Sequence, residues 1–330
     1  MAKKNRSAAR KPLTDEEREQ RRQAERELLA AAVEQLKSSE GWLRWLKVRS
    51  SFHSYSATNQ LLIALQNPNA TRVAGFQRWL RLGRCVRKGE KGIRIFAPVP
   101  PSKKKLDEGR GAGADPRQKP RTLFKLTSVF DLSQVDELPP PAVVVDLAAP
   151  FDLDIAGDEL AWMLTDGGPL HGLAGDLGIR LVLAPRTGER GAHGWYRPKD
   201  RTLCVYTDAS GNSQAATAVH EFAHALVRLD RRPGDPELDY AHEELVVESV
   251  AYSVLATLGV DAGQSSVPYL ASWSQQAPIE TLEQHAKLID RLAKRIEDRV
   301  LAGPGEDPPA GPAAAASDVA AAPAREAVAA

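Results

Sequence analysis

The chain has 330 residues, of which 42% are hydrophobic and 26% are charged. This composition is typical of a globular protein, and the length is sufficient for two domains of ordinary size. No run of about 18 apolar residues is present, so we expect no membrane-spanning helix. The charged N-terminus lacks the apolar core of a secretory signal. Cys85 and Cys204 are the only cysteines, which excludes a disulfide framework and favours a reducing cytoplasm.

The net charge of +1 conceals a strong asymmetry along the chain. Residues 1–130 contain 29 Lys and Arg against 12 Asp and Glu, a net charge of +17. The other 200 residues contain 15 basic and 31 acidic residues, a net charge of −16. A basic half followed by an acidic half indicates that the first half meets a polyanion and the second does not.

The first elements follow a basic arm, residues 1–13, that we expect to be disordered. Thr14 is a plausible N-cap with Glu17 three residues later, which predicts the start of a helix. An apolar stripe continues that helix as far as Leu36. Residues 41–70 then have the pattern of a helix, a turn and a second helix.

The rest of the basic half has mixed character. A short helix is predicted over 75–83, a turn over 87–92 and a strand over 93–99. Residues 100–120 are rich in Lys, Gly and Pro and are typical of a long hairpin loop, and 121–135 alternate as the returning strand. We therefore expect an α+β domain over residues 14–138.

A proline-rich linker, 139–150, marks the change in charge. Beyond it, short strands are predicted near 179–184, 193–197 and 201–206. Helices are predicted over about 213–229, 240–258 and 279–301. These elements suggest a second α+β domain over 151–301. The Ala/Pro-rich residues 302–330 have the composition of a disordered tail.

The sequence AVHEFAHAL contains the motif HExxH. Residues four apart lie on one face of a helix, so His220 and His224 can direct their rings at a single ion. Zinc accepts imidazole nitrogen and leaves one position for water in catalytic sites. Glu221 would be the general base that accepts a proton from that water. Because the surrounding helix is apolar, chance histidines on a helix surface are the less favoured interpretation.

The third ligand should come from the next helix, where Glu244 and Glu248 lie four residues apart and share a face. One of them could bind Zn²⁺ while the other orients a histidine. We favour Glu248, which has the more apolar neighbours, and Glu244 is the alternative. Glu243 and His242 are expected on the solvated surface. Tyr269 could polarise a substrate carbonyl but is more typical of a core aromatic.

The segment before this helix resembles a hairpin, and its edge strand could hold an extended peptide by backbone pairing. In the basic half, cations alternate with aromatic residues. Cations neutralise phosphates and aromatic faces stack on unpaired bases, which favours single strands over duplex. A buried, structural role is an equally good interpretation for Trp79. The candidate DNA contacts are Tyr55, Asn59, Arg72, Arg78, Trp79, Arg84, Arg87, Lys88, Lys91 and Arg94.

These residues carry a family resemblance. Residues 54–99, with Tyr55, Asn59, Trp79, Gly83 and the turn VRKGEKG, and then VFDLSQ, resemble the N-terminal single-stranded-DNA-binding domain of ArdC-type antirestriction proteins. AVHEFAHAL and EELVVESVAYSVLATLGV resemble the zincin-like metallopeptidase domain of that family, which is related to the ImmA/IrrE peptidases. Together they cover roughly residues 25–300. The link between His224 and Glu244 is shorter than in the family, residues 139–200 match loosely, and 102–120 resemble an insertion.

The resemblance implies a protein that binds single-stranded DNA, protects incoming DNA from restriction and carries a zinc peptidase acting on an unidentified protein or peptide. Two alternatives stay open. One is a DNA-binding protection protein whose zincin domain is inactive. The other is a regulatory peptidase that cleaves a repressor when DNA activates it.

Overall fold

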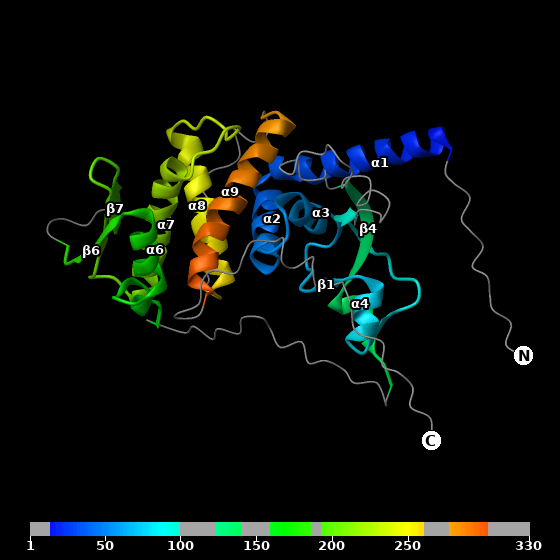
Figure 1. Ribbon diagram of the computed structural model, residues 1–330, viewed down its shortest axis with the longest axis horizontal. Coiled ribbons are helices and arrows are strands. Elements are labelled where there is room, and N and C mark those ends of the chain that lie inside the picture. The colour runs from blue at the N-terminus through cyan, green and yellow to red at the C-terminus, as the bar shows by residue number, and fades with distance from the viewer. Residues whose placement is uncertain (1–13, 100–122, 140–158, 187–192, 261–276, 303–330) are drawn as a thin grey trace, which may run out of the picture.

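The computed structural model describes residues 14–99, 123–139, 159–186, 193–260 and 277–302 (Figure 1). Several predicted features lie outside these residues, namely the N-terminal arm, the 100–120 loop and Tyr269. The same holds for the linker and the tail, except for the first residue of each. The helices of the described part are α1 (Asp15–Glu34), α2 (Ser39–Ser51), α3 (Ala57–Gln66), α4 (Phe76–Arg81), α6 (Pro169–Leu177), α7 (Gly211–Leu229), α8 (Tyr240–Thr257) and α9 (Ile279–Val300). The strands are β1 (Val73–Ala74), β2 (Arg84–Val86), β3 (Ile93–Val99), β4 (Leu123–Asp131), β5 (Val135–Glu137), β6 (Arg180–Ala184), β7 (Gly194–Arg197) and β8 (Thr202–Tyr206). The predicted α+β class is confirmed.

The capping box expected at the start of α1 is present. Thr14 Oγ1 accepts a hydrogen bond from the backbone N–H of Glu17, and the Glu17 carboxylate accepts one from the backbone N–H of Thr14. The predicted apolar stripe ends in a short 3₁₀ turn, Gln35–Lys37, where Leu36 is fully buried. Helices α2 and α3 follow as the pattern predicted.

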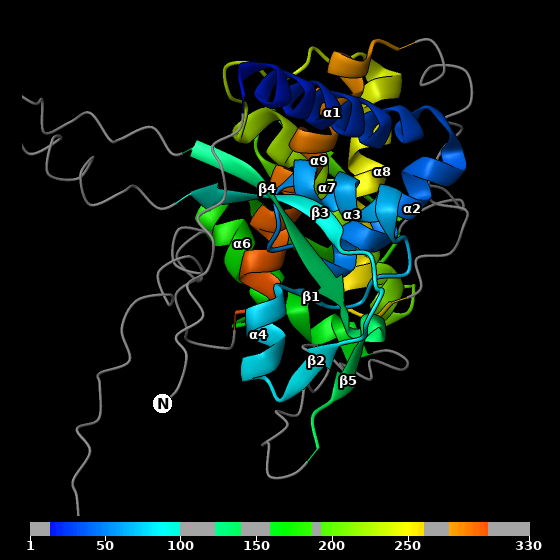
Figure 2. The same cartoon turned by 90° about the vertical axis from the view of Figure 1, so that its right-hand side faces the viewer.

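Strands β3 and β4 pair antiparallel, and β1 pairs with the other edge of β4 (Figure 2). Two amide side chains of α3 cover the open edge of β3. Asn59 donates to the backbone O of Phe96 and accepts from its N–H, each at 2.9 Å. Gln66 makes the same pair of hydrogen bonds with the backbone of Arg94, also at 2.9 Å. Helix α3 therefore replaces a fourth strand, because its amides satisfy backbone groups that a strand would pair.

A small unit, which we call the satellite module, lies at one end of this sheet and comprises residues 73–92 and 130–137. It contains β1, α4 and the antiparallel pair β2–β5 (Figure 2). Its own small core is formed by Ala74, Trp79 and Val135. It therefore has a large surface for its size, and most of the basic residues singled out above lie on it.

The second half begins with a three-stranded sheet of order β6–β8–β7, in which β6 is parallel and β7 antiparallel to the central β8. Helix α7 packs on β7 and β8. Gly194 permits close contact, because a Cβ there would lie 2.6 Å from both the Cys204 backbone O and the Thr217 side chain. Strand β7 is thus pressed against α7 at the edge of the sheet.

The two halves share one hydrophobic core. Helix α8 packs against α2, and α9 packs against α8 and also contacts α1 and α3 (Figure 1). One cluster of buried apolar side chains runs from Ala32 in α1 to Val300 in α9. Trp42 of α2 donates a hydrogen bond of 3.0 Å to Ser249 of α8 inside this core. The predicted domains are consequently packed on each other rather than joined only by a linker. None of the described helices is long and apolar enough to cross a bilayer.

Candidate metal centre

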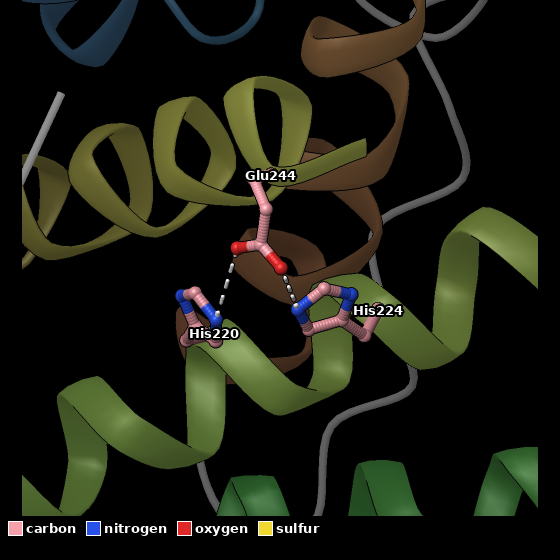
Figure 3. A group of neighbouring side chains, drawn as sticks. All are labelled: His220, His224 and Glu244. Carbon is pink, nitrogen blue, oxygen red and sulfur yellow. Dashed lines mark ion pairs between the residues drawn. The ribbon is translucent and has the colours of Figure 1, made fainter. Parts of the chain in front are cut away.

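Helix α7 positions the HExxH motif. Ser210 caps its N-terminus by accepting a hydrogen bond from the backbone N–H of Ser213. Buried residues such as Phe222 and Leu226 fix the core-facing side of the helix. His220 and His224 lie one turn apart on a half-exposed side, with ring centroids 5.0 Å apart (Figure 3). The four-residue spacing therefore brings both rings together, as expected.

Glu244 of α8 completes the group (Figure 3). Its Oε2 lies 4.0 Å from His220 Nε2, and its Oε1 lies 3.6 Å from His224 Nε2. One ligand atom from each of the three residues can be chosen so that all lie within 4.8 Å of one another. Two imidazoles and one carboxylate are a suitable donor set for a divalent ion such as zinc. The described residues thus contain a group that could hold a metal ion.

Two more glutamates contact the opposite nitrogens of the same rings. Glu248 Oε1 lies 3.3 Å from His220 Nδ1, and Glu243 Oε1 lies 3.0 Å from His224 Nδ1. A carboxylate on Nδ1 keeps the proton there and leaves Nε2 with its lone pair available to a metal. Both Nε2 atoms are the ones that face Glu244. Both rings therefore present the nitrogen that a metal ion would need.

This arrangement separates the roles of the glutamates. Glu248, the favoured third ligand, lies against His220 Nδ1, whereas the alternative, Glu244, lies between the two Nε2 atoms. The geometry therefore favours Glu244 as ligand and Glu248 as the residue that orients His220. Glu243, expected on a solvated face, has a side chain only 17% exposed and contacts both His224 and Arg228. Sequence spacing gave no signal for Glu243, since it is adjacent to Glu244 and lies 100° away on the helix.

The charge state of this cluster reflects its burial. Burial lowers the pKa of His220, but the hydrogen bond and charge of Glu248 outweigh it, and the net pKa is raised. Burial raises the pKa of Glu221 above its ordinary value, although the charges of His220 and His224 and a hydrogen bond from the backbone N–H of Tyr196 act against it. A carboxyl group with a raised pKa accepts a proton more readily, as a general base requires.

Glu221 also adjoins both the edge strand and a cavity. The backbone N–H that donates to Glu221 belongs to Tyr196, which lies in β7. A cavity of about 390 Å³ opens between β7, α7 and α8. The cavity is lined by His193, Gly194, Ala216, Thr217, His220, Glu221, Glu248, Ala251, Tyr252 and Leu255. The lining combines small apolar residues with polar and charged ones, and a molecule that fills the pocket would contact His220 and Glu221.

The candidate DNA contacts divide into buried and exposed residues. Trp79 is 1% exposed and donates a hydrogen bond from Nε1 to the backbone O of Phe130. Asn59 is 9% exposed and uses its amide on β3. The Tyr55 hydroxyl donates to the backbone O of Val73 at 3.4 Å, and burial raises its pKa. These three side chains have structural roles, and their contact with DNA remains a prediction.

The turn VRKGEKG is held from within the satellite module. Gly89 has a φ of +93°, a conformation that favours glycine. Glu90 pairs with Arg87 at 2.9 Å and accepts a hydrogen bond from Gln134, which also donates to the backbone O of Lys91. The motif VFDLSQ, to which Gln134 belongs, therefore fixes the turn.

The remaining basic residues differ in how they are engaged. Arg84 contacts Glu137, and Arg87 contacts Asp136 in addition to Glu90. Arg72 and Arg94 are half-buried. The exposed cations of the satellite module are Arg78, Arg81, Arg87, Lys88 and Lys91, and Phe76 is exposed among them. Phe76 and Arg81 belong to the predicted pattern of cations and aromatic residues, although neither is one of the candidate DNA contacts.

Comparisons with known proteins support the resemblance. Residues 15–130 match the family described as the N-terminal domain of anti-restriction factor ArdC. An uncharacterized protein of Bacillus anthracis is 25% identical over 281 residues, which are 77% of this chain and 46% of that protein. This chain thus spans about half the length of that relative.

Two solved structures are similar. The metal-free crystal structure of antirestriction ArdC protein from R388 plasmid is 22% identical, covers 75% of this chain and 85% of its own, and has a TM-score of 0.46. The Mn(II)-bound structure of the same protein is 21% identical, with 78% and 91% covered and a TM-score of 0.47. The family match covers residues 15–130, so the comparisons identify an ArdC N-terminal type of domain in the basic part of the chain.

Proposed function

We propose that this chain is an antirestriction-type protein that binds single-stranded DNA and hydrolyses peptide bonds with the help of a divalent metal ion. Zn²⁺ is the first candidate for that ion. The observation that carries the enzymatic part is the position of Glu244 between the Nε2 atoms of His220 and His224. Glu221 lies beside this group and lines the adjoining cavity. This combination of metal ligands, base and pocket is what metal-assisted hydrolysis requires.

Each residue would have a defined role. His220, His224 and Glu244 would hold the ion, which supplies Lewis-acid polarisation and activates water. Glu221 would accept a proton and return it to the leaving amine. Glu248 and Glu243 would keep the two imidazoles oriented. The outer edge of β7 would pair with an extended substrate, because β7 is the last strand of its sheet.

The DNA-binding part rests on the satellite module. Its exposed cations, Arg78, Lys88 and Lys91 among them, can neutralise phosphates, and Phe76, 43% exposed, can stack on a base. Arg84 and Arg87 form ion pairs with the acidic residues near the turn, and these pairs stabilise the fold of the module. Family membership over residues 15–130 agrees with a role at DNA.

The test compares the 330-residue chain with its Glu221→Gln variant, after loading both with Zn²⁺. Both should bind the ion and a fluorescent 30-mer single strand equally well. Only the wild type should cleave a fluorescent unfolded protein substrate, and the variant should lose at least ~100-fold of that rate if Glu221 is the general base.

Two outcomes would select the alternatives. Cleavage that occurs only when the single strand is present would indicate a peptidase activated by DNA. Absence of cleavage by a wild type that binds both metal and DNA would indicate a protection protein with an inactive centre. Cleavage by the variant at the wild-type rate would contradict the role given to Glu221.

A further inference from the structure

The two metal-bearing helices are joined by a short link, residues 230–239, whose conformation sets the position of Glu244. His224 lies near the C-terminal end of α7, and Glu244 lies in the second turn of α8. A shift of one residue along a helix moves a side chain by 1.5 Å and 100°. Contacts of 3.6 and 4.0 Å from one carboxylate to two rings would not survive such a shift. The link must therefore be held in one conformation.

Part of that conformation is local. Pro233 and Gly234 form the corner of a turn in which the N–H of Asp235 donates to the backbone O of Arg232. Gly234 has a φ of +90°, which is the conformation that position requires in a type II turn. The Asp235 carboxylate also accepts a hydrogen bond of 2.8 Å from the N–H of Arg232. The turn is closed, but these contacts do not attach it to the helices.

Arg291 of α9 makes that attachment. Its Nη1 and Nη2 donate to the two carboxylate oxygens of Asp235, each at 2.7 Å. Its Nε donates to Asp230 Oδ2 and its Nη2 to the backbone O of Asp230, both at 3.1 Å. The side chains of Arg291 and Asp235 are only 22% and 10% exposed. A two-pronged contact of this kind fixes direction as well as distance.

We propose that Arg291 is a positioning residue for the metal centre, which it serves by clamping the first part of the α7–α8 link, from Asp230 to Asp235, to α9. Asp230 is the C-cap residue of α7, so Arg291 grips the link where α7 ends and again at Asp235, five residues before α8 begins. Helix α9 is itself packed against α7 and α8. The guanidinium thus ties the end of α7, and the link that leads to α8, to a third helix that contributes no ligand to the group. The hydrogen bond to Arg291 also lowers the pKa of Asp235, which keeps the carboxylate charged.

This inference rests on the proposed metal site, and it is tested by metal affinity rather than by activity. Dissociation constants for Zn²⁺ are measured by competition with a chelating dye on the wild-type chain and on Arg291→Gln, Asp235→Asn and the double variant. Each single variant should bind roughly 10- to 100-fold more weakly, as when other residues that support ligands are removed. The double variant should bind Zn²⁺ with about the affinity of the single variant that binds it less tightly, because both substitutions break the same contact.

Two controls separate positioning from general destabilisation. Arg232→Gln removes a cation that also pairs with Asp230 but lies within the link and is 58% exposed, so it should leave the affinity unchanged. Ile296→Val truncates a fully buried side chain of α9 and should lower thermal stability without changing the affinity. Co²⁺ bound to Arg291→Gln should also give an altered visible spectrum, which a loss of stability alone does not produce.

The outcomes are distinguishable. Wild-type affinity in Arg291→Gln and Asp235→Asn would overturn the role of Arg291 while leaving the metal site in place. Loss of affinity in Ile296→Val equal to that in Arg291→Gln would also overturn it, because the effect would then follow stability. Failure of the wild type to bind Zn²⁺ would contradict the metal site and the clamp together.

Discussion

Arg49 of α2 and Glu297 of α9 form an ion pair inside the core, although they are 248 residues apart in sequence. The guanidinium nitrogens lie 2.5 and 2.7 Å from the two carboxylate oxygens, and both side chains are at most 1% exposed. Asp290 of α9 lies 3.3 Å from Arg49 Nε. The pair joins the basic half of the chain to the acidic half at the place where their helices pack.

Removing one partner of this pair should be costly. Arg49→Met leaves a buried carboxylate without its cation, and such a loss destabilises by about 3–5 kcal/mol. Arg44→Met, on the same helix but in a surface pair with Glu40, should cost less than about 0.5 kcal/mol. The free energy of unfolding in urea, measured on the whole 330-residue chain, checks both predictions. Similar values for the two variants would contradict a role for the buried pair in joining the halves.

Acid should weaken the same contact. Burial raises the pKa of Glu297, but the charge and hydrogen bonds of Arg49 outweigh it, so the net pKa lies below the ordinary value of 4.5. A carboxyl group with a lowered pKa in the folded state stabilises the protein above its unfolded pKa and loses that contribution as pH falls toward the folded pKa.

Above pH 4.5, the titration of Glu297 should therefore leave the melting temperature unchanged. As the pH falls below 4.5, the melting temperature should decline. The decline should be shallower in Arg49→Met/Glu297→Leu, which lacks the Glu297 carboxyl group. Melting temperatures between pH 3 and 7 test this, and equal slopes for the wild type and the double variant would be inconsistent with it.

Local patterns predicted much of the fold. The capping box at Thr14 and the four-residue spacing of His220 and His224 depend on neighbours in sequence, and both were recovered. The choice between Glu244 and Glu248 could not be made this way, because both share a helix face and only the packing angle of α8 against α7 distinguishes them. Arg49 carried no signal at all, since its partner Glu297 is brought close only by the tertiary fold.

The same limit explains the basic half. A pattern of cations and aromatic residues identifies a surface that can bind an anion, but it does not say which members point outward. Trp79 and Asn59 both match the family motif. Trp79 belongs to the core of the satellite module, and Asn59 covers the edge of β3. Phe76, three residues before Trp79 on a short helix, is exposed instead. Helical spacing alone could not decide which of the two rings would be buried.

Substitutions on the satellite module should separate binding from folding. Lys88→Ala/Lys91→Ala should weaken single-strand binding and reduce the slope of log affinity against log salt by about 1.4, roughly 0.7 for each lost phosphate contact. Lys125→Ala, an exposed lysine of β4 outside the module, should leave the slope unchanged. Fluorescence anisotropy of a labelled 30-mer at several salt concentrations measures both. An unchanged slope in the double variant would exclude the turn from the DNA interface.

The most direct test of the central claim is the metal content of the 330-residue chain after dialysis against Zn²⁺ or Mn²⁺. The wild type should retain one ion per chain, Glu244→Ala and His224→Ala should retain none, and Glu248→Gln should bind about 10- to 100-fold more weakly while keeping the same stoichiometry. Full retention by Glu244→Ala together with loss in Glu248→Gln would show that the ligand roles are reversed. No bound ion in the wild type would contradict the metal centre itself.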